Sequence, residues 1–283
     1  MSVDSVRIVV ICAVKPLADS LIETLRGLGH DPVALITPRR PDGPPRPAFL
    51  DLTDASAPPG LDLLFPRDKF SVEPLVRAYE PDLVVCWGFP WKIPLTALEA
   101  PRLGSINMHP GMLPRHRGPV PLAWAVRDGD PVWGSTWHYM DAELDTGNLL
   151  TQGSVPIEDD DVDIGEFGDK LRANAIGLLP RALERVFAGD PGDPQPEEGV
   201  TWAGHFEDDD YARIDWSHPA RVIHDQVRAW HLTFGLSGVR APVAEIDGER
   251  VVVLQTRLTD PGGEARRVEC ADGPIWVVAT EPV

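Results

Sequence analysis

The stretch VRIVVICAVKPLADSLIETLRGLGHDPVALIT, residues 6–37, decides the fold class. Its first part, residues 6–13, is apolar and rich in β-branched side chains, which predicts a buried strand. Residues 16–30 carry apolar side chains at helical spacing and have Gly29 near their end, a common position for the end of a helix. Residues 31–37 are extended and apolar again. The order strand, helix, strand predicts an α/β protein with a parallel sheet and crossover helices.

The same alternation continues downstream. We expect strands at 61–65, 82–88 and 103–108, helices at 71–79, 121–129 and 163–188, and extended segments at 132–141 and 148–157. Pro180 is expected to kink or split the last of these helices, because proline cannot donate a backbone hydrogen bond. The segment 38–60 is rich in proline and is expected to be a loop.

A second domain is expected after the segment GDPGDPQPEEG, residues 189–199. An amphipathic helix at 218–230 is followed by two hairpins, 243–258 and 264–280, each with an Asp-Gly turn. We therefore expect a larger domain at 1–190, a linker at 191–204 and a small helix-plus-β domain at 205–283.

Composition excludes several classes of protein. The 283 residues are 43% apolar and 25% charged, as in soluble globular proteins. No apolar run approaches the about 20 residues of a membrane helix, and the first residues lack the basic start of a signal peptide. Cys12, Cys86 and Cys270 are odd in number and far apart, so we expect no disulfides, no metal site and a cytoplasmic location. The formal net charge of −18 disfavours binding to nucleic-acid phosphates.

Two strand ends are candidates for the site. The loop after the first strand has no GxGxxG, so a dinucleotide fingerprint is unsupported. In open α/β sheets a ligand still lies at the carboxyl ends of the strands. Here those ends read CWGFPWKIP, residues 86–94, and NMHPGMLPRHRG, residues 107–118.

Asn107 and His109 stand two residues apart at such a strand end, so their side chains leave the same face. An amide donor and an imidazole together can stabilise an oxyanion in a tetrahedral intermediate. Asp145, in DAELDTG at 141–147, could keep the histidine charged or accept a proton. There is no GxSxG nucleophile, so transfer would be direct. The residues alone leave open that this is an ordinary loop pair beside a common turn.

The whole pattern resembles the folate-dependent formyltransferases, which include enzymes that act on methionyl-tRNA, on glycinamide ribonucleotide and on amino sugars. It consists of Asn-x-His, Leu-Pro-x-x-Arg-Gly and an Asp-x-Gly turn, and it covers most of residues 1–190. The second domain, with Ile-Asp-Trp before its helix, is similar to the C-terminal domain of the tRNA enzymes. The resemblance implies a Rossmann-like N-terminal domain, a smaller β-barrel-like (OB-like) C-terminal domain, and 10-formyltetrahydrofolate as co-substrate.

The resemblance also implies roles for individual residues. Asn107, His109 and Asp145 would be catalytic, and we expect them to face solvent at the strand end. Side chains from three loops would contact the pterin: Phe89, Trp91 and Ile93, then Met112, Leu113 and Pro114, and finally Leu144. Arg115 and Arg117 are candidates for binding a phosphate or carboxylate of the acceptor, although Arg117 could instead be structural.

The acceptor amine is the least determined part. Residues 200–283 hold eight arginines and no lysine against fourteen acidic residues, which favours a small amine, such as an amino sugar or a hydroxylated ornithine in natural product biosynthesis, over tRNA. Arginines at 39, 40 and 46 lie where the tRNA enzymes have a basic loop, so a methionyl-tRNA substrate stays an alternative. A folate-binding protein without transferase activity is a third reading. The sequence does not determine the oligomeric state.

Overall fold

The computed structural model describes residues 5–38, 60–161, 164–206, 211–232 and 242–283. The proline-rich segment 38–60, with the arginines at 39, 40 and 46, lies almost wholly outside these ranges. The chain separates into two compact units. Unit 1 comprises Met1–Arg117, Gly134–Ser154 and Leu171–Thr201, and unit 2 comprises Gly118–Trp133, Val155–Lys170 and Trp202–Val283.

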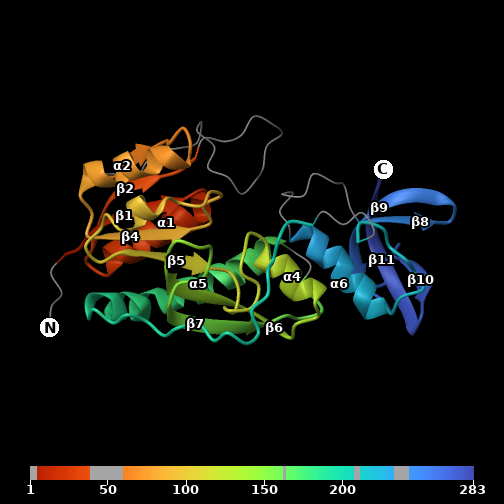
Figure 1. Ribbon diagram of the computed structural model, residues 1–283. Helices are drawn as coiled ribbons and strands as arrows, with labels where there is room; N and C mark the ends of the chain where they lie inside the picture. Colours follow the sequence, from red (N-terminus) through yellow and green to blue (C-terminus); the bar gives the residue numbers. More distant parts are fainter. Residues whose placement is uncertain (1–4, 39–59, 162–163, 207–210, 233–241) are drawn as a thin grey trace. The chain divides into compact units, whose positions relative to one another are not determined.

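A seven-stranded sheet has the order β3-β2-β1-β4-β5-β6-β7. The four pairings from β3 to β5 are parallel, and β6 is antiparallel to β5. Figure 1 shows β2, β1, β4 and β5 side by side. The strands span Arg7–Cys12 (β1), Asp31–Ile36 (β2), Asp62–Leu64 (β3), Leu83–Trp87 (β4), Ser105–His109 (β5), Val132–Tyr139 (β6) and Leu149–Pro156 (β7). The α/β fold with a parallel sheet is therefore confirmed.

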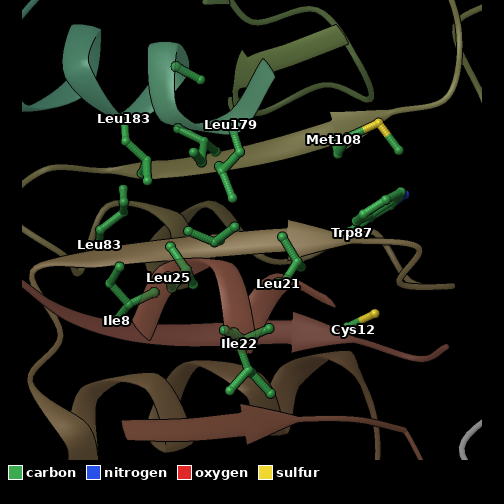
Figure 2. Close-up of a cluster of buried hydrophobic side chains, with 14 of the residues drawn as sticks. Ile8, Cys12, Leu21, Ile22, Leu25, Leu83, Trp87, Met108, Leu179 and Leu183 are labelled. Atoms are coloured by element: carbon green, nitrogen blue, oxygen red, sulfur yellow. The ribbon is translucent and has the colours of Figure 1, made fainter. Parts of the chain in front are cut away.

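The two faces of this sheet have separate cores, because successive strand residues point to opposite sides. On one face, Ile8 and Val10 pack with helix α1 (Lys15–Gly27) and with the C-terminal part of α5 (Ile164–Phe187), as Figure 2 shows in part. On the other face, Val9 and Ile11 pack with α2 (Val72–Tyr79), which follows a short 3-10 turn η1 (Lys69–Ser71), and with α3 (Leu95–Leu98).

Helix α5 runs continuously through Pro180, so the expected split does not occur. Its buried residues Ala175, Leu179, Ala182 and Leu183 keep one face of the helix on the sheet. The burial of this face supports the helix where one backbone hydrogen bond is lost.

Unit 2 contains a four-stranded antiparallel sheet of order β10-β11-β9-β8. Its strands span Val243–Ile246 (β8), Glu249–Arg257 (β9), Arg266–Cys270 (β10) and Gly273–Pro282 (β11). Helix α6 (Ala220–His231) places Ile223 and Val227 in a core with Val253 and Ile275, and α4 (Pro121–Arg127) packs on α6. Both predicted hairpins and the predicted helix are present.

The two compact units do not follow chain order, since residues 118–133 and 155–170 group with the C-terminal part. The division at 191–204 therefore stays a prediction about sequence modules. Within the described ranges, no helix combines the length and the apolarity that crossing a membrane requires.

Candidate active site

The predicted residue pair lies at the end of β5. Asn107 and His109 alternate with Ile106 and Met108, which point into the core with α1 and α5, so the polar pair leaves the opposite face. In the sheet register, Asn107 stands between Cys86 of β4 and His138 of β6. Strand β5 therefore presents the Asn107 amide and the His109 imidazole on one face, as the sequence spacing predicted.

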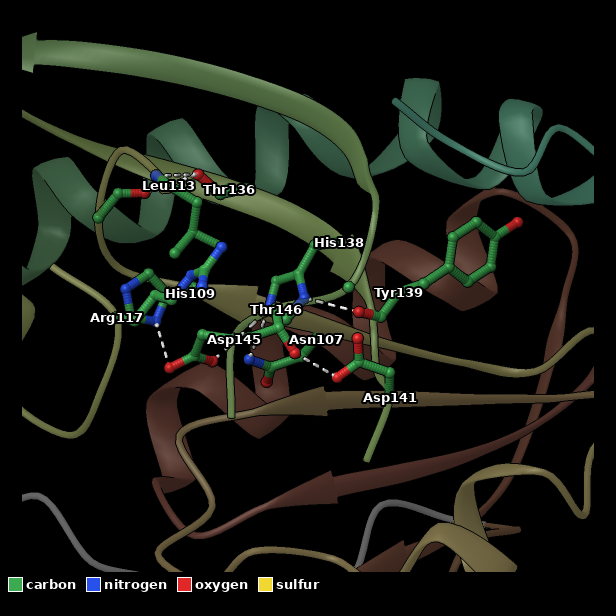
Figure 3. A network of polar contacts seen from close by, with 12 residues as sticks. Asn107, His109, Leu113, Arg117, Thr136, His138, Tyr139, Asp141, Asp145 and Thr146 are labelled. Atoms are coloured by element: carbon green, nitrogen blue, oxygen red, sulfur yellow. Dashed lines mark hydrogen bonds and ion pairs between the residues drawn. The ribbon is translucent and has the colours of Figure 1, made fainter. Parts of the chain in front are cut away.

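His109 contacts Asp145 in a nearly closed environment. Its Nδ1 lies 3.4 Å from Asp145 Oδ2 (Figure 3). Its Nε2 donates to the His116 carbonyl oxygen at 2.8 Å. The two side chains are 3% and 10% exposed, so the expectation that they face solvent was wrong. Since Nε2 carries one proton, a second proton on Nδ1 makes the contact with the carboxylate attractive. His109 thus places one ring nitrogen on a loop carbonyl and the other within ion-pair distance of a carboxylate.

His138 completes the cluster, and sequence reasoning missed it. Its Nδ1 donates to the Tyr139 carbonyl oxygen at 2.7 Å, and its Nε2 lies 3.2 Å from Asn107 Nδ2 and 3.7 Å from Asp145 Oδ1. Burial, which outweighs the opposing charge of Asp145, lowers the pKa of His138 to about 4. His138 is therefore neutral near pH 7.

The loop after β5 is held by two polar side chains of the neighbouring strands. The Thr136 hydroxyl donates to the Gly111 carbonyl oxygen at 2.6 Å. Gln152 Nε2 donates to the Leu113 carbonyl oxygen at 2.8 Å and to Thr136 Oγ1 at 3.0 Å. Leu113 is buried, Met112 and Pro114 are half-buried, and the Leu113–Pro114 peptide is cis. The loop therefore has a defined conformation beside β6 and β7.

Arg117 is tied to the loop that carries Asp145. Its Nε and Nη2 donate to Gln195 Oε1 at 3.1 and 2.6 Å. Gln195 Nε2 in turn donates to the carbonyl oxygens of Asp145 and Gly147 at 2.9 and 2.8 Å. A Cβ at Gly147 would collide with the Tyr139 carbonyl oxygen, which explains the glycine of Asp-Thr-Gly. Arg117 thus makes the contacts of a structural residue, which was one of the two roles that the sequence left open. Arg115, in the same loop, is half-buried.

The loop after β4 carries the other predicted contacts. The rings of Phe89 and Trp91 meet edge to face at 5.3 Å, and Ile93 is buried in the core with α2 and α3. Lys92 Nζ lies 3.0 Å from Glu143 Oε2, which joins this loop to the Asp145 loop. Next to Asp145, the Leu144 side chain is 41% exposed. Phe89, Trp91 and Leu144 thus lie on two loops joined beside the polar cluster.

One sequence signal could have found two of the missed residues. Thr136 and His138 repeat the two-residue spacing of Asn107 and His109, as expected for two adjacent strands with polar residues on one face. The amides Gln152 and Gln195 have no such signal, since each reaches a backbone carbonyl far away in the sequence.

Comparisons with known proteins identify the family to which this chain belongs. A family model described as formyl transferase matches residues 67–183. Over 274 residues the chain is 32% identical to a methionyl-tRNA formyltransferase of Ruegeria pomeroyi, which covers 91% of this chain and 86% of that protein. The chain belongs to the folate-dependent formyltransferase family. The formyltransferase is also 33% identical to a methionyl-tRNA formyltransferase of Moorella thermoacetica, over 92% of this chain and 87% of that one.

Solved structures share the fold of this formyltransferase. An N-formyltransferase from Helicobacter canadensis, in complex with folinic acid and dTDP-3-aminofucose, superimposes with a TM-score of 0.71 at 17% identity. That match covers 98% of this chain and 100% of the other. HypX from Aquifex aeolicus, in complex with tetrahydrofolic acid, gives a TM-score of 0.69 at 19% identity, covering 98% of this chain and 44% of that one. The formyltransferase thus spans less than half of HypX.

Proposed function

We propose that this protein transfers a formyl group from 10-formyltetrahydrofolate to the amine of a small molecule, giving the N-formyl product and tetrahydrofolate. The observation that carries the proposal is at the end of β5, where His109 contacts Asp145 and Asn107 leaves the same face of the strand. The same contact argues against a folate-binding protein without activity, because a binding site alone has no need of a nearly buried imidazole–carboxylate pair.

The three residues have complementary roles in this reaction. The Asn107 amide donates a hydrogen bond to the formyl oxygen as it becomes negative, and the positive charge on His109 stabilises the same oxygen. The Nε2–H of His109, which the His116 carbonyl accepts here, would shift toward the oxyanion. Asp145 keeps His109 charged and accepts, directly or through water, the proton that the attacking amine loses.

The bonds and protons balance. The amine nitrogen forms a bond to the formyl carbon, and the carbonyl electron pair moves to oxygen, where Asn107 and His109 hold it. The C=O bond then re-forms, and the bond from the carbon to N10 of the folate breaks. N10 takes up the proton held near Asp145, and tetrahydrofolate leaves.

The residues of the three loops suit a reduced folate. Phe89, Trp91 and Leu144 offer apolar surface for a pterin, and Leu144 is well exposed in a loop that also carries Asp145. Gln152 and Thr136 fix the backbone of the loop 111–114, whose amides and carbonyls can hydrogen-bond the edge of the ring. This chain would supply binding and orientation, while the folate supplies the activated formyl group.

A small acceptor fits the charge of the protein. The net charge is −18, and no lysine follows Lys170. Arg115 and Arg117 are the candidates in this loop for an anionic group on the acceptor, and Arg117 also donates to Gln195. The second candidate acceptor is methionyl-tRNA, which is favoured by relatives that match most of the chain.

One experiment separates the two acceptors. Amino sugars, hydroxylated ornithine and initiator methionyl-tRNA would each be offered with 10-formyltetrahydrofolate, with Asp145→Asn as the inactive control. Turnover of a small amine, with no effect of moderate salt, is expected. Efficient formylation of the tRNA that falls steeply as salt rises would overturn the small-acceptor proposal.

A further inference from the structure

We propose that His138 is a positioning residue that holds the Asn107 amide in its productive orientation, acting as a neutral hydrogen-bond acceptor. This inference rests on the proposed function, because the orientation that matters is the one facing a formyl oxygen. His138 lies in β6 directly opposite Asn107 in the antiparallel register, so the two side chains are neighbours on the same face.

The tautomer of His138 follows from its partners. The Tyr139 carbonyl oxygen, 2.7 Å from Nδ1, can only accept, so Nδ1 carries the proton. In the neutral ring Nε2 then has no proton and accepts from Asn107 Nδ2 at 3.2 Å. An Asn107 amide turned by 180° would face this nitrogen with its oxygen, and two acceptors would repel. The contact therefore selects one of the two orientations of the amide.

The selected orientation is the one that catalysis needs. One Nδ2 hydrogen is used by His138, and the second can donate to a formyl oxygen. Within the described ranges, the Asn107 side chain makes this one hydrogen bond. His138 would thus hold the donor in place without touching the substrate.

The surroundings of His138 keep the ring neutral. Burial is the largest influence and lowers its pKa, and the charge of His109 acts in the same direction. Asp145, whose Oδ1 is 3.7 Å from Nε2, and Asp141 act against it, as does the Tyr139 carbonyl. Protonation would place an N–H against the amide N–H of Asn107, and the amide would have to turn away.

The first test is kinetic, with 10-formyltetrahydrofolate and the best acceptor. His138→Leu keeps the volume but removes the acceptor, and kcat should fall by about 10- to 100-fold with the KM for the folate changed less than about threefold. His138→Gln should recover part of the rate, because its Oε1 can accept from Asn107. The matched control is Ser135→Ala, which removes another buried polar group from β6 and should leave the rate unchanged.

A double-mutant cycle distinguishes positioning from general stability. In an Asn107→Ala background, His138→Leu should have no further effect on kcat, because there is no amide left to position. Effects that multiply would overturn the proposal, and so would a His138→Leu enzyme with the wild-type rate. If wild-type protein formylates no amine at all, the proposed function fails instead.

The second test does not need activity. Nitrogen NMR of the wild-type protein with labelled histidine should show His138 neutral at pH 7, with Nδ1 protonated and Nε2 unprotonated. Asn107→Ala should shift the Nε2 resonance, because that nitrogen loses its donor. A protonated Nε2, or an Nε2 resonance that ignores Asn107→Ala, would overturn the assignment even if His138→Leu did not fold.

Discussion

Two buried histidines, one in each unit, show how similar chemistry can serve different ends. In unit 2, His224 has Nδ1 2.8 Å from Thr256 Oγ1 and Nε2 3.0 Å from the Asp159 carbonyl oxygen. In unit 1, His109 places Nδ1 against the Asp145 carboxylate and shares its other nitrogen with a loop carbonyl. His224 pairs with neutral partners, whereas His109 pairs with a charge.

The difference teaches which polar cluster is a site. His224 is neutral, because burial and the nearby Arg228 lower its pKa to about 4, and its neutral contacts fix one packing arrangement. The unit 1 cluster instead joins an imidazole, a carboxylate and an amide at the end of a strand. Substitutions in the two clusters should therefore act on different quantities, namely stability in unit 2 and turnover in unit 1.

The largest effect is expected at Asp145. Asp145→Asn removes the charge that pairs with His109 and the group that accepts the proton, so kcat should fall by about 1,000-fold or more at an unchanged melting temperature. Asp141→Asn is the matched control. Its oxygen accepts from Glu143 N and Thr146 Oγ1, which an amide oxygen can also do, so turnover should stay within about threefold. Equal losses of kcat in Asp145→Asn and Asp141→Asn would show that Asp145 has no special role in catalysis.

The next largest effect is expected in acid, on the free energy of unfolding of unit 2. In the unfolded chain His224 has a pKa near its ordinary value of 6.5, above its folded value of about 4. The unfolded chain therefore binds the proton first, and the stabilising contribution is full above about pH 6.5 and declines as the pH falls toward 4. The full difference corresponds to about 3 kcal/mol, of which about 1 kcal/mol is lost by pH 5.5.

Urea unfolding at pH 7.5 and 5.5 would measure this contribution. Wild type should lose about 1 kcal/mol more than His224→Gln over this range. Formyl transfer at pH 7.5 should be the same in both proteins once each is folded. A His224→Gln enzyme that is fully folded but inactive would show that unit 2 takes part in the chemistry.

The sequence was sufficient for the parts of the molecule that depend on local pattern. The strand at 82–88 became β4, Leu83–Trp87, because its unbroken apolar run suits a strand that is buried on both faces. The spacing of Asn107 and His109 likewise fixed their common face. Both results follow from the two-residue period of a strand.

What the sequence could not provide depends on register and on distant partners. His138 is brought opposite Asn107 by the antiparallel pairing of β5 with β6, which no local pattern encodes. From the sequence, Arg117 was a candidate for binding an anion. Its partner Gln195 is 78 positions away, and no spacing rule connects the two residues. The burial of His109 depends likewise on loops that come together in three dimensions.

A smaller effect is expected from the link between Arg117 and Gln195. Gln195→Leu removes the hydrogen bonds to the carbonyls of Asp145 and Gly147, so kcat should fall by about tenfold because the Asp145 loop is less well positioned. Arg117→Leu should act through the same link, and the two changes combined should cost little more than one. Steady-state kinetics of the four proteins tests this. A rise in the acceptor KM for Arg117→Leu alone would instead assign Arg117 to substrate binding.

The smallest effect is expected at the rim of the proposed folate site. Trp91 is half-buried and packs edge to face on Phe89, so Trp91→Ala should raise the KM for 10-formyltetrahydrofolate by about three- to tenfold through lost aromatic contact, with little change in kcat. Phe70→Ala is the matched control, since its ring is 70% exposed and lies on η1 of the same unit. Titration calorimetry with 5-formyltetrahydrofolate gives the same comparison without turnover. If Phe70→Ala weakened folate binding and Trp91→Ala did not, the pterin would lie nearer the end of β3 than the end of β4. The roles proposed for Asn107, His109 and Asp145 would then be unchanged, but the folate would reach them from the β3 side of the sheet.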